Sequence, residues 1–296
     1  MSQDLSREER MAQQRQLRRK RRRLQIASRI VFCAFLGVFV TSAWMLIDRK
    51  LEDHRSRQSF DELSSMLESV PDPGNADLPQ PGKPSPEPGK EPEKPIHPQT
   101  DSNGVLVRYS KLYARNPDLF GWISIPDTVL DYPVMRTPED EEYYLRRGFD
   151  GTDNRSGVPF VDVDCTEEGF HWIVYGHNMQ NGTMFQTLES YASEDFWREH
   201  PVIRFDTLYR EGTYEVMAAF HTRVFYQNET EVFRYYNYDD LSDPKDYADY
   251  AAWMKENSLY ETGVDAEYGD RLLTLITCES RGPRNNRFVV VAREIP

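Results

Sequence analysis

Three residues that could take part in catalysis stand at the ends of apolar, strand-like runs. Cys278 closes one run and is followed by a polar loop, and His177 enters a loop directly after a run that ends in Gly176. Arg287 opens the last apolar run of the chain, nine residues after Cys278. Taken alone, each has a plainer explanation, because free cysteines are often simply buried and a single histidine or arginine is often a loop residue or a solvated charge. Their shared placement at strand ends is what suggests a common site.

Together the three side chains supply the parts of an acyl-transfer site. A cysteine nucleophile reacts as a thiolate, which a nearby imidazolium or guanidinium favours. Histidine can give a proton to a departing amine, and arginine presents fixed donors to a carbonyl oxygen or an oxyanion. Two further donors are candidates for substrate binding: the Thr277 hydroxyl and the backbone N–H of Glu279. A β-branched Thr277 that merely fits a strand is an equally good explanation of that residue.

Eight short β-like runs must position these groups. A helical pattern covers residues 244–260, with Asp243 available as N-cap and Pro244 in the first turn, and another covers residues 105–116 and ends before Pro117. This order predicts a mostly β fold, either a closed barrel or a sandwich, with one helix before the strands and one inserted between two late strands. The strand-like runs are residues 121–126, 129–135, 158–162, 171–177, 201–208, 213–225, 271–278 and 287–294.

The 296-residue chain joins two segments of opposite charge. Residues 1–50 contain 12 Lys and Arg against 4 Asp and Glu, whereas residues 51–296 contain 24 against 45. The strongly acidic body argues against nucleic-acid binding, which needs a basic face. The sequence also lacks the common nucleotide and zinc motifs, and Asp162 and Asp164 alternate with valines as in a strand rather than as in an EF-hand. We therefore expect neither a metal nor a cofactor.

The basic N-terminal segment leads into an apolar one. Residues 30–47 carry no charge, and as a helix they would extend about 27 Å, close to the thickness of a bilayer's hydrocarbon core. Because the basic residues at 15–23 come first, the positive-inside rule places the N-terminus in the cytoplasm and residues 51–296 outside. A cleaved signal peptide is the alternative, although its apolar region is usually shorter. We predict a basic cytoplasmic segment at 1–29 and a transmembrane helix at 30–47.

Residues 48–100 are predicted to be a spacer between the membrane and the β domain. Apolar side chains at helical spacing predict a short juxtamembrane helix over residues 51–70, separate from the membrane helix. Residues 71–100 hold 10 of the 19 prolines, a composition that favours an extended, semi-rigid chain. The remaining residues, 101–296, are predicted to form one catalytic domain.

Three segments, in order, resemble motifs of the sortase family of cysteine transpeptidases. They are VYGHNM at residues 174–179, TLITCES at 274–280 and NNRFVVVARE at 285–294. The resemblance extends over residues 105–296 and implies an eight-stranded β-barrel of the sortase type behind an N-terminal membrane anchor. The helix before the first strand and the helix between late strands are most similar to those of class B, although Ile276 stands where class B sequences commonly have serine.

The resemblance assigns a role to each of the three candidate residues. Cys278 matches the nucleophile of the TLxTC motif, His177 the catalytic histidine of the GH motif, and Arg287 the arginine that opens the final strand. Arg281 and Arg284 lie in the same loop, but only Arg287 directly precedes the terminal apolar run.

The implied reaction is a ping-pong acyl transfer at the outer face of a Gram-positive cell membrane. The substrates would be secreted proteins that carry a C-terminal sorting signal, and the acceptor would be an amine of a peptidoglycan precursor. Wall anchoring of one or a few proteins is favoured over pilus assembly. No cofactor is implied.

Other interpretations stay open at this point. A disulfide between Cys165 and Cys278, on the oxidising side of the membrane, would abolish the nucleophile. A non-catalytic, stalked binding module would share the anchor, the spacer and the β domain. A cysteine hydrolase that releases surface proteins would share the nucleophile but would not depend on an acceptor amine.

Overall fold

The computed structural model describes residues 7–68, 98–166, 168–279 and 283–296. The chain divides into two compact units, Met1–Arg55 and Ser56–Pro296. The second unit contains all eight strands and every candidate catalytic residue. Most of the proline-rich part of the predicted spacer lies outside the described residues.

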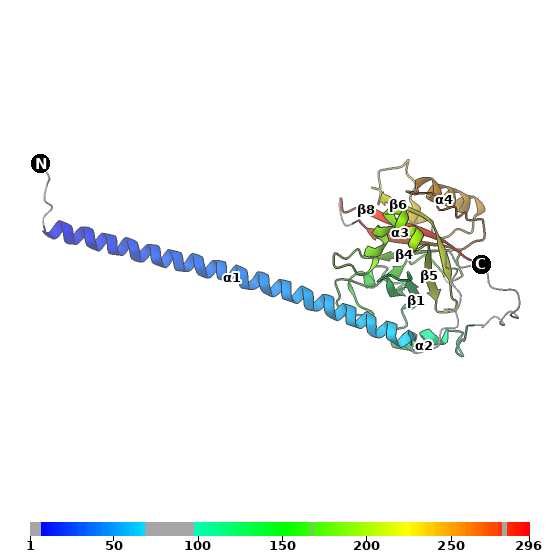
Figure 1. The fold of residues 1–296 in the computed structure, drawn as a ribbon, viewed down its shortest axis with the longest axis horizontal. Helices are drawn as coiled ribbons and strands as arrows, with labels where there is room; N and C mark the ends of the chain where they lie inside the picture. The colour runs from blue at the N-terminus through cyan, green and yellow to red at the C-terminus, as the bar shows by residue number, and fades with distance from the viewer. Residues whose placement is uncertain (1–6, 69–97, 167, 280–282) are drawn as a thin grey trace. The chain divides into compact units, whose positions relative to one another are not determined.

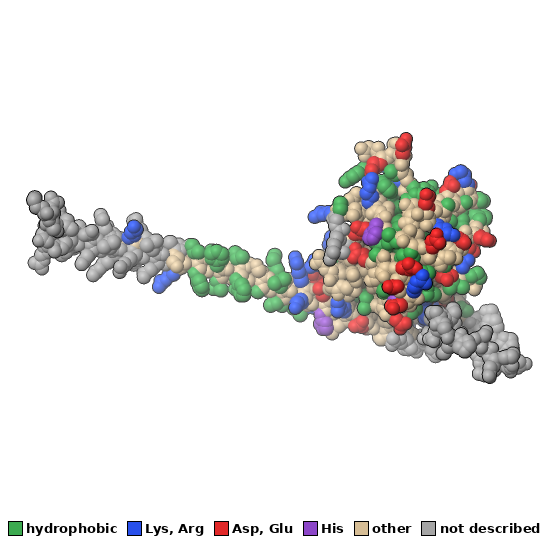
Figure 2. All heavy atoms as spheres, turned by 45° about the horizontal axis from the view of Figure 1, so that its top comes forward, with side chains coloured by type: hydrophobic (Ala, Val, Ile, Leu, Met, Phe, Trp, Pro, Cys, Tyr) green, Lys and Arg blue, Asp and Glu red, His purple; other side chains and the backbone are tan. Residues whose placement is uncertain are grey.

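The N-terminal helix α1 is continuous from Arg7 to Glu68. We predicted two helices here, one over residues 30–47 and another over 51–70, and the predicted break between them is wrong. No glycine or proline occurs between Val38 and Val70, and the charged residues at 48–50 are compatible with a helix, so nothing in the chain interrupts the backbone hydrogen bonds. Hydrophobic side chains form an exposed band along the middle of α1 (Figure 2).

Among the described residues, one helical stretch is long and apolar enough to cross a membrane. It is Val31–Leu67, with a mean hydropathy of 1.9 in its most apolar part. Its last turns belong to the second compact unit, where Phe60 and Leu63 are buried in the hydrophobic core. The last turns of α1, from Ser56 to Glu68, therefore pack with the β domain, although the predicted domain boundary was residue 101.

All eight predicted strands are present, and they close into a barrel in the order β1-β2-β3-β4-β7-β8-β6-β5. The barrel rather than the sandwich is therefore the correct one of the two predicted architectures. The strands are β1 (Leu119–Ser124), β2 (Asp131–Met135), β3 (Phe160–Val161), β4 (His171–Gly176), β5 (Val202–Thr207), β6 (Thr213–Arg223), β7 (Leu272–Cys278) and β8 (Asn286–Glu294).

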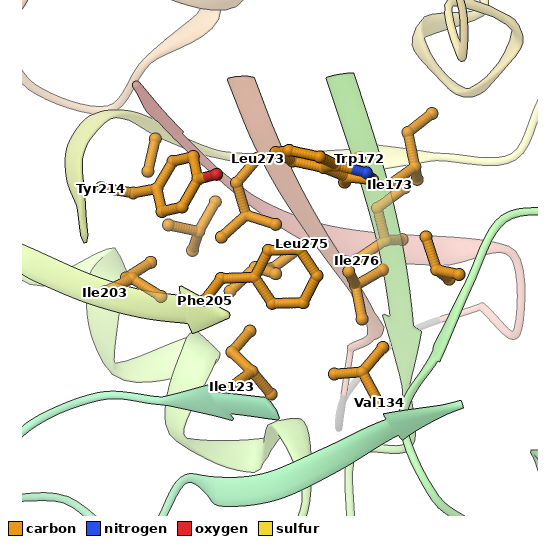
Figure 3. Packing of buried hydrophobic residues seen from close by; sticks show 14 of the residues in the cluster. Ile123, Val134, Trp172, Ile173, Ile203, Phe205, Tyr214, Leu273, Leu275 and Ile276 are labelled. Atoms are coloured by element: carbon orange, nitrogen blue, oxygen red, sulfur yellow. The ribbon is translucent and has the colours of Figure 1, made fainter. Parts of the chain in front are cut away.

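Large apolar side chains fill the barrel (Figure 3). Trp172 packs edge-on against Phe205 with ring centroids 5.7 Å apart, and Tyr214 completes this group. Alternation along β5 explains the pattern, because Ile203 and Phe205 are buried while Val202 and Arg204 are partly exposed. Every second residue of the strand therefore contributes to a core that holds the strand ends in place.

The two predicted helices of the β domain are confirmed. Helix α2 covers Val107–Arg115, and helix α4 covers Pro244–Asn257 between β6 and β7. The Asp243 side chain caps α4 by accepting hydrogen bonds from the backbone N–H groups of Lys245 and Asp246. Figure 1 shows α4 beside β6, which it contacts.

Several short helical segments were not predicted. They lie in the connections between strands and are three to eight residues long. These segments are η2 (Tyr143–Arg146), η3 (Phe185–Ala192), α3 (Glu194–Glu199) and η4 (Tyr235–Asn237).

Candidate active site

The topology places His177 and Cys278 at the same edge of the barrel. Strands β4 and β7 are parallel neighbours, and their last paired residues are Gly176 and Thr277. His177 and Cys278 each follow one member of that pair, so the imidazole and the thiol emerge from adjacent strands at one end of the sheet. This arrangement depends on the long connection that parallel strands require, here the whole stretch from η3 to α4.

Arg287 joins them from the other side. Strands β7 and β8 are antiparallel, and Cys278 is the register partner of Arg287. Directly opposed residues project toward the same face of a sheet. A cavity of about 370 Å³ opens at this edge. Its lining residues include all three candidates, together with Glu141, Glu142, Leu145, Phe160, Tyr175, Gly176, Val224, Tyr235, Tyr236, Ile276 and Thr277.

His177 is half-buried and oriented by a backbone carbonyl. Its Nε2 lies 2.8 Å from the carbonyl oxygen of Leu145. Because a carbonyl can only accept, Nε2 carries the proton in this contact and Nδ1 is left to exchange protons with substrate. The pKa of His177 lies below its ordinary value, chiefly through burial, with a smaller contribution from the nearby positive charge of Arg146.

The three cysteines are free, so the Cys165–Cys278 disulfide does not form in this structure. Cys278 is exposed in the mouth of the cavity, whereas Cys165 is buried. Burial raises the pKa of the Cys165 thiol to about 12. Its sulfur also accepts a hydrogen bond of 3.4 Å from the backbone N–H of Ile173. Cys165 is thus a core residue, and Cys278 is the thiol that can react.

Arg287 is held at the base of its own loop. Its Nη1 donates to the carbonyl oxygens of Arg284 and Asn286, at 2.9 and 2.8 Å. Arg284 is exposed and is not among the residues that line the cavity, and Arg281 lies outside the described residues. Of the arginines described in this loop, Arg287 is the one that lines the cavity.

The two additional donors that we predicted are already occupied. The Thr277 side chain is buried, and its hydroxyl donates to the carbonyl oxygen of Gly176 at 2.8 Å. The backbone N–H of Glu279 donates to the carbonyl oxygen of Asn286 at 3.3 Å, because the β7–β8 pairing continues one residue past Cys278. Neither group is free to bind a substrate carbonyl in this geometry, which corrects both assignments.

Sequence reasoning missed two residues at the site. Asn178 donates from its side-chain amide to the carbonyl oxygen of Cys278 at 2.8 Å, and its position beside His177 in VYGHNM was the available signal. Tyr235 lies in the cavity wall, fully buried, and its hydroxyl has no hydrogen-bond partner among the described residues. No local sequence pattern marks Tyr235, because its place depends on how the β6–β7 connection folds back.

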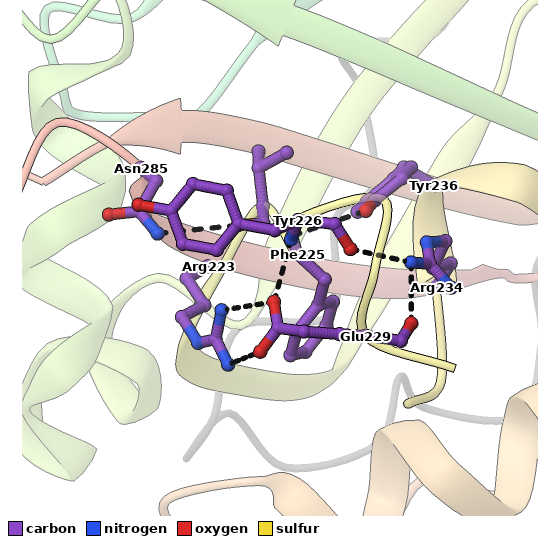
Figure 4. Close-up of polar contacts among 8 residues, drawn as sticks. Arg223, Phe225, Tyr226, Glu229, Arg234, Tyr236 and Asn285 are labelled. Atoms are coloured by element: carbon purple, nitrogen blue, oxygen red, sulfur yellow. Dashed lines mark hydrogen bonds and ion pairs between the residues drawn. The ribbon is translucent and has the colours of Figure 1, made fainter. Parts of the chain in front are cut away.

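A cluster of polar contacts lies in this connection (Figure 4). Arg223 donates to both carboxylate oxygens of Glu229, at 2.8 and 2.5 Å, and this pairing lowers the pKa of Glu229 to about 2. Arg234 donates to the carbonyl oxygens of Tyr226 and Glu229, at 2.9 and 2.7 Å. Hydrogen bonds therefore connect the end of β6 and the residues that follow it, before the chain reaches Tyr235 in the cavity wall.

The carboxylate of Asp162 is bound by protein donors, one of them the cavity residue Tyr175. Asp162 accepts hydrogen bonds from the Tyr175 hydroxyl at 2.9 Å and from the backbone N–H of Asp164 at 3.1 Å. Within the part of the chain that the structure describes, no group of three or more His, Cys, Asp or Glu side chains is arranged to hold a metal ion.

A family profile described as the Sortase domain matches residues 123–295, more than half of the chain. The chain belongs to the sortase family. The predicted resemblance is confirmed, and the sortase domain accounts for all eight strands except the first residues of β1.

Similar proteins define the class within the family. Sortase B of Listeria monocytogenes is 33% identical over 185 residues, which are 61% of this chain and 71% of that protein. The crystal structure of Clostridium perfringens sortase B is 31% identical, has a TM-score of 0.56, and is matched over 63% of this chain and 98% of that one. The Staphylococcus aureus sortase B–substrate complex has a TM-score of 0.64, with 83% and 98% of the two chains matched, and at 24% identity it supports the fold.

These relationships identify a class B sortase, and its activity is that of a cysteine transpeptidase. The prediction of fold class is also confirmed, including the helix before the barrel and the helix between β6 and β7.

Proposed function

We propose that Cys278 is the nucleophile, His177 the general acid and base, and Arg287 the group that stabilises the oxyanion. The observation that carries the proposal is the convergence of the three residues on one cavity from β7, the end of β4 and β8. Cys278 is the exposed thiol of this cavity.

In the first half-reaction, the Cys278 thiolate attacks the carbonyl carbon of a threonine in the sorting motif of a secreted protein. The carbonyl oxygen becomes an oxyanion, which the Arg287 guanidinium stabilises with hydrogen bonds and charge. The C–N bond then breaks, and His177 gives the proton on Nδ1 to the departing amine. The products are a thioester on Cys278 and a free C-terminal fragment of the substrate.

In the second half-reaction, an amine of a peptidoglycan precursor attacks the thioester. The C–S bond breaks, Cys278 leaves as a thiolate, and His177 takes the proton that the amine loses. A new amide bond joins the secreted protein to the precursor.

We further propose that α1 anchors the enzyme in the cell membrane, with residues 1–29 in the cytoplasm, the span at 30–47 and the catalytic domain outside. The support is the apolar, exposed middle of α1 and the basic residues that precede it. Protease treatment of intact protoplasts tests the orientation. Digestion of the sortase domain from the outside is expected, and its full protection would contradict the proposal.

The test of the chemistry uses the full-length protein in detergent and a pool of peptides with threonine-containing sorting motifs. Intact-mass spectrometry should detect a thioester adduct on the wild type and none on Cys278→Ala. Addition of an amine acceptor such as triglycine should convert the adduct into an amide-linked product.

Three outcomes separate the alternatives. An adduct that water resolves at the same rate with and without amine would indicate a hydrolase. An adduct on Cys278→Ala would remove Cys278 from the mechanism. Failure of the wild type to form any adduct across the pool would contradict the proposed substrate class.

A further inference from the structure

The ends of β4 and β7 exchange two side-chain hydrogen bonds. Thr277, near the end of β7, donates from its hydroxyl to the carbonyl oxygen of Gly176, the last residue of β4. Asn178, two residues beyond that carbonyl, donates from its side-chain amide to the carbonyl oxygen of Cys278, the last residue of β7. Both distances are 2.8 Å. Each strand end thus supplies a donor to the last carbonyl of the other.

The backbone explains why Cys278 needs this donor. Glu279 is bonded to Asn286 of β8 through its backbone N–H, so in the alternating pattern of an antiparallel pair the carbonyl of Cys278 points away from β8 and toward β4. The parallel ladder has already ended at Gly176 and Thr277. The Asn178 amide therefore takes the place of a main-chain donor that β4 no longer provides.

The loop that carries Asn178 is itself held in place. The backbone N–H of Phe185 donates to the carbonyl oxygen of His177 at 2.9 Å, and Asn178 and Met184 form a β-bridge. Gly176 allows the Phe185 ring to pack against the backbone, since a Cβ at this position would lie 2.5 Å from a ring carbon. The ring nitrogen Nε2 of His177 is fixed by the Leu145 carbonyl. The Asn178 and Thr277 bonds then connect this loop to the nucleophile.

We propose that Asn178 and Thr277 are positioning residues that set the separation between the His177 imidazole and the Cys278 thiol. The inference rests on the proposed function of that pair. It changes the role of Thr277, whose buried hydroxyl acts on the backbone of β4 instead of on the substrate. It also gives Asn178 a role in catalysis without contact to the reacting atoms.

A catalytic pair tolerates little displacement, and a shift of about 1 Å can reduce the rate about 100-fold. For Asn178→Ala we therefore expect kcat to fall by about 10- to 100-fold with KM unchanged within about twofold. Asn178→Asp has nearly the same shape but cannot donate when ionised, so it should lose as much activity. Thr277→Val should lower kcat about tenfold, and Thr277→Ser, which keeps the hydroxyl, should restore most of it.

Asn257→Ala is the matched control. Its side-chain amide also donates to a backbone carbonyl at 2.8 Å, that of Trp253, but within α4. This variant should acylate at the wild-type rate. The measurement is the single-turnover rate of thioester formation on full-length protein, with kcat and KM from steady-state assays and thermal unfolding to verify that each variant folds.

A double variant tests whether the two bonds act together. If they define one geometry, Asn178→Ala combined with Thr277→Val should lose little more than the worse single variant. Three results would overturn the positioning role while leaving the proposed function intact. They are an effect on KM without an effect on kcat, a wild-type kcat in Asn178→Ala, and a kcat of Thr277→Ser as low as that of Thr277→Val. A wild-type enzyme that forms no thioester would overturn the proposed function, and this inference with it.

Discussion

Cys278 and Arg287 face each other across the β7–β8 pair, and the next pair along, Glu279 and Asn286, is joined by a main-chain hydrogen bond. In an antiparallel sheet, a pair next to a hydrogen-bonded one brings its side chains closer together. Strand register therefore places Cys278 and Arg287 opposite each other. Eight residues separate the two in the sequence.

Replacement of Arg287 should slow acylation strongly. We expect Arg287→Ala to reduce kcat/KM about 100- to 1000-fold, the usual effect of losing one oxyanion donor. Arg287→Lys should remain impaired, because an ammonium does not reproduce the fixed fork of donors. Steady-state assays of full-length variants test this, with exposed Arg284→Ala as the control. Loss of activity in Arg284→Ala but not in Arg287→Ala would transfer the role to Arg284.

The pH dependence of acylation should report His177. Its pKa lies below the ordinary value of 6.5, chiefly through burial. The protonated imidazole must give a proton to the departing amine. The rate of acylation should therefore decline as the pH rises through this lowered pKa. Arg146→Gln removes a positive charge that lowers the pKa, so the decline should move to higher pH.

The control for this shift is Arg198→Gln, on the exposed surface of α3, where Arg198 pairs with Glu194. Its pH profile should match the wild type. If the acylation rate of Arg146→Gln declined at the same pH as that of the wild type, a group other than His177 would be responsible for the decline.

The two cysteines of the sortase domain should differ sharply in reactivity. Cys278 is exposed, whereas Cys165 is buried and its pKa is raised to about 12. Iodoacetamide at neutral pH should therefore alkylate Cys278 and leave Cys165 unmodified until the protein is denatured. Peptide mapping by mass spectrometry gives the two rates. Cys165→Ala should keep its transpeptidase activity, and an inactive but folded variant would be evidence against this assignment.

The stability of the sortase domain should depend on pH through His171. The ring is fully buried, with Nδ1 2.6 Å from the carbonyl oxygen of Tyr238 and Nε2 2.8 Å from the Thr274 hydroxyl, and burial lowers its pKa to about 4. The unfolded chain binds a proton near pH 6.5 and the folded protein only near pH 4, so stability falls as the pH decreases across this interval. The loss should approach about 3 kcal/mol.

Urea unfolding of the full-length protein at pH 8 and pH 5, followed by tryptophan fluorescence, measures this effect. His171→Gln should be less stable at pH 8 because it loses the hydrogen bonds, but it should lose less stability than the wild type on acidification. An equal loss in both proteins would show that other groups cause the acid sensitivity.

The sequence was sufficient for the features that depend on local pattern. Alternating or continuous apolar runs marked all eight strands, and Asp243 with Pro244 marked the start of α4, because these signals arise from neighbouring residues. The types and order of His177, Cys278 and Arg287 indicated acyl-transfer chemistry, and the motifs around them indicated the sortase family.

Only the tertiary structure decided what each of these groups contacts. Closure of the barrel aligned β4 with β7, which occupied the Thr277 hydroxyl and brought the Asn178 amide to the carbonyl of Cys278, a residue one hundred positions away. It also buried Cys165 apart from Cys278 and placed Phe60 of α1 in the core. A sequence states which groups can donate or accept, but their partners follow from strand register and burial, which the whole chain determines together.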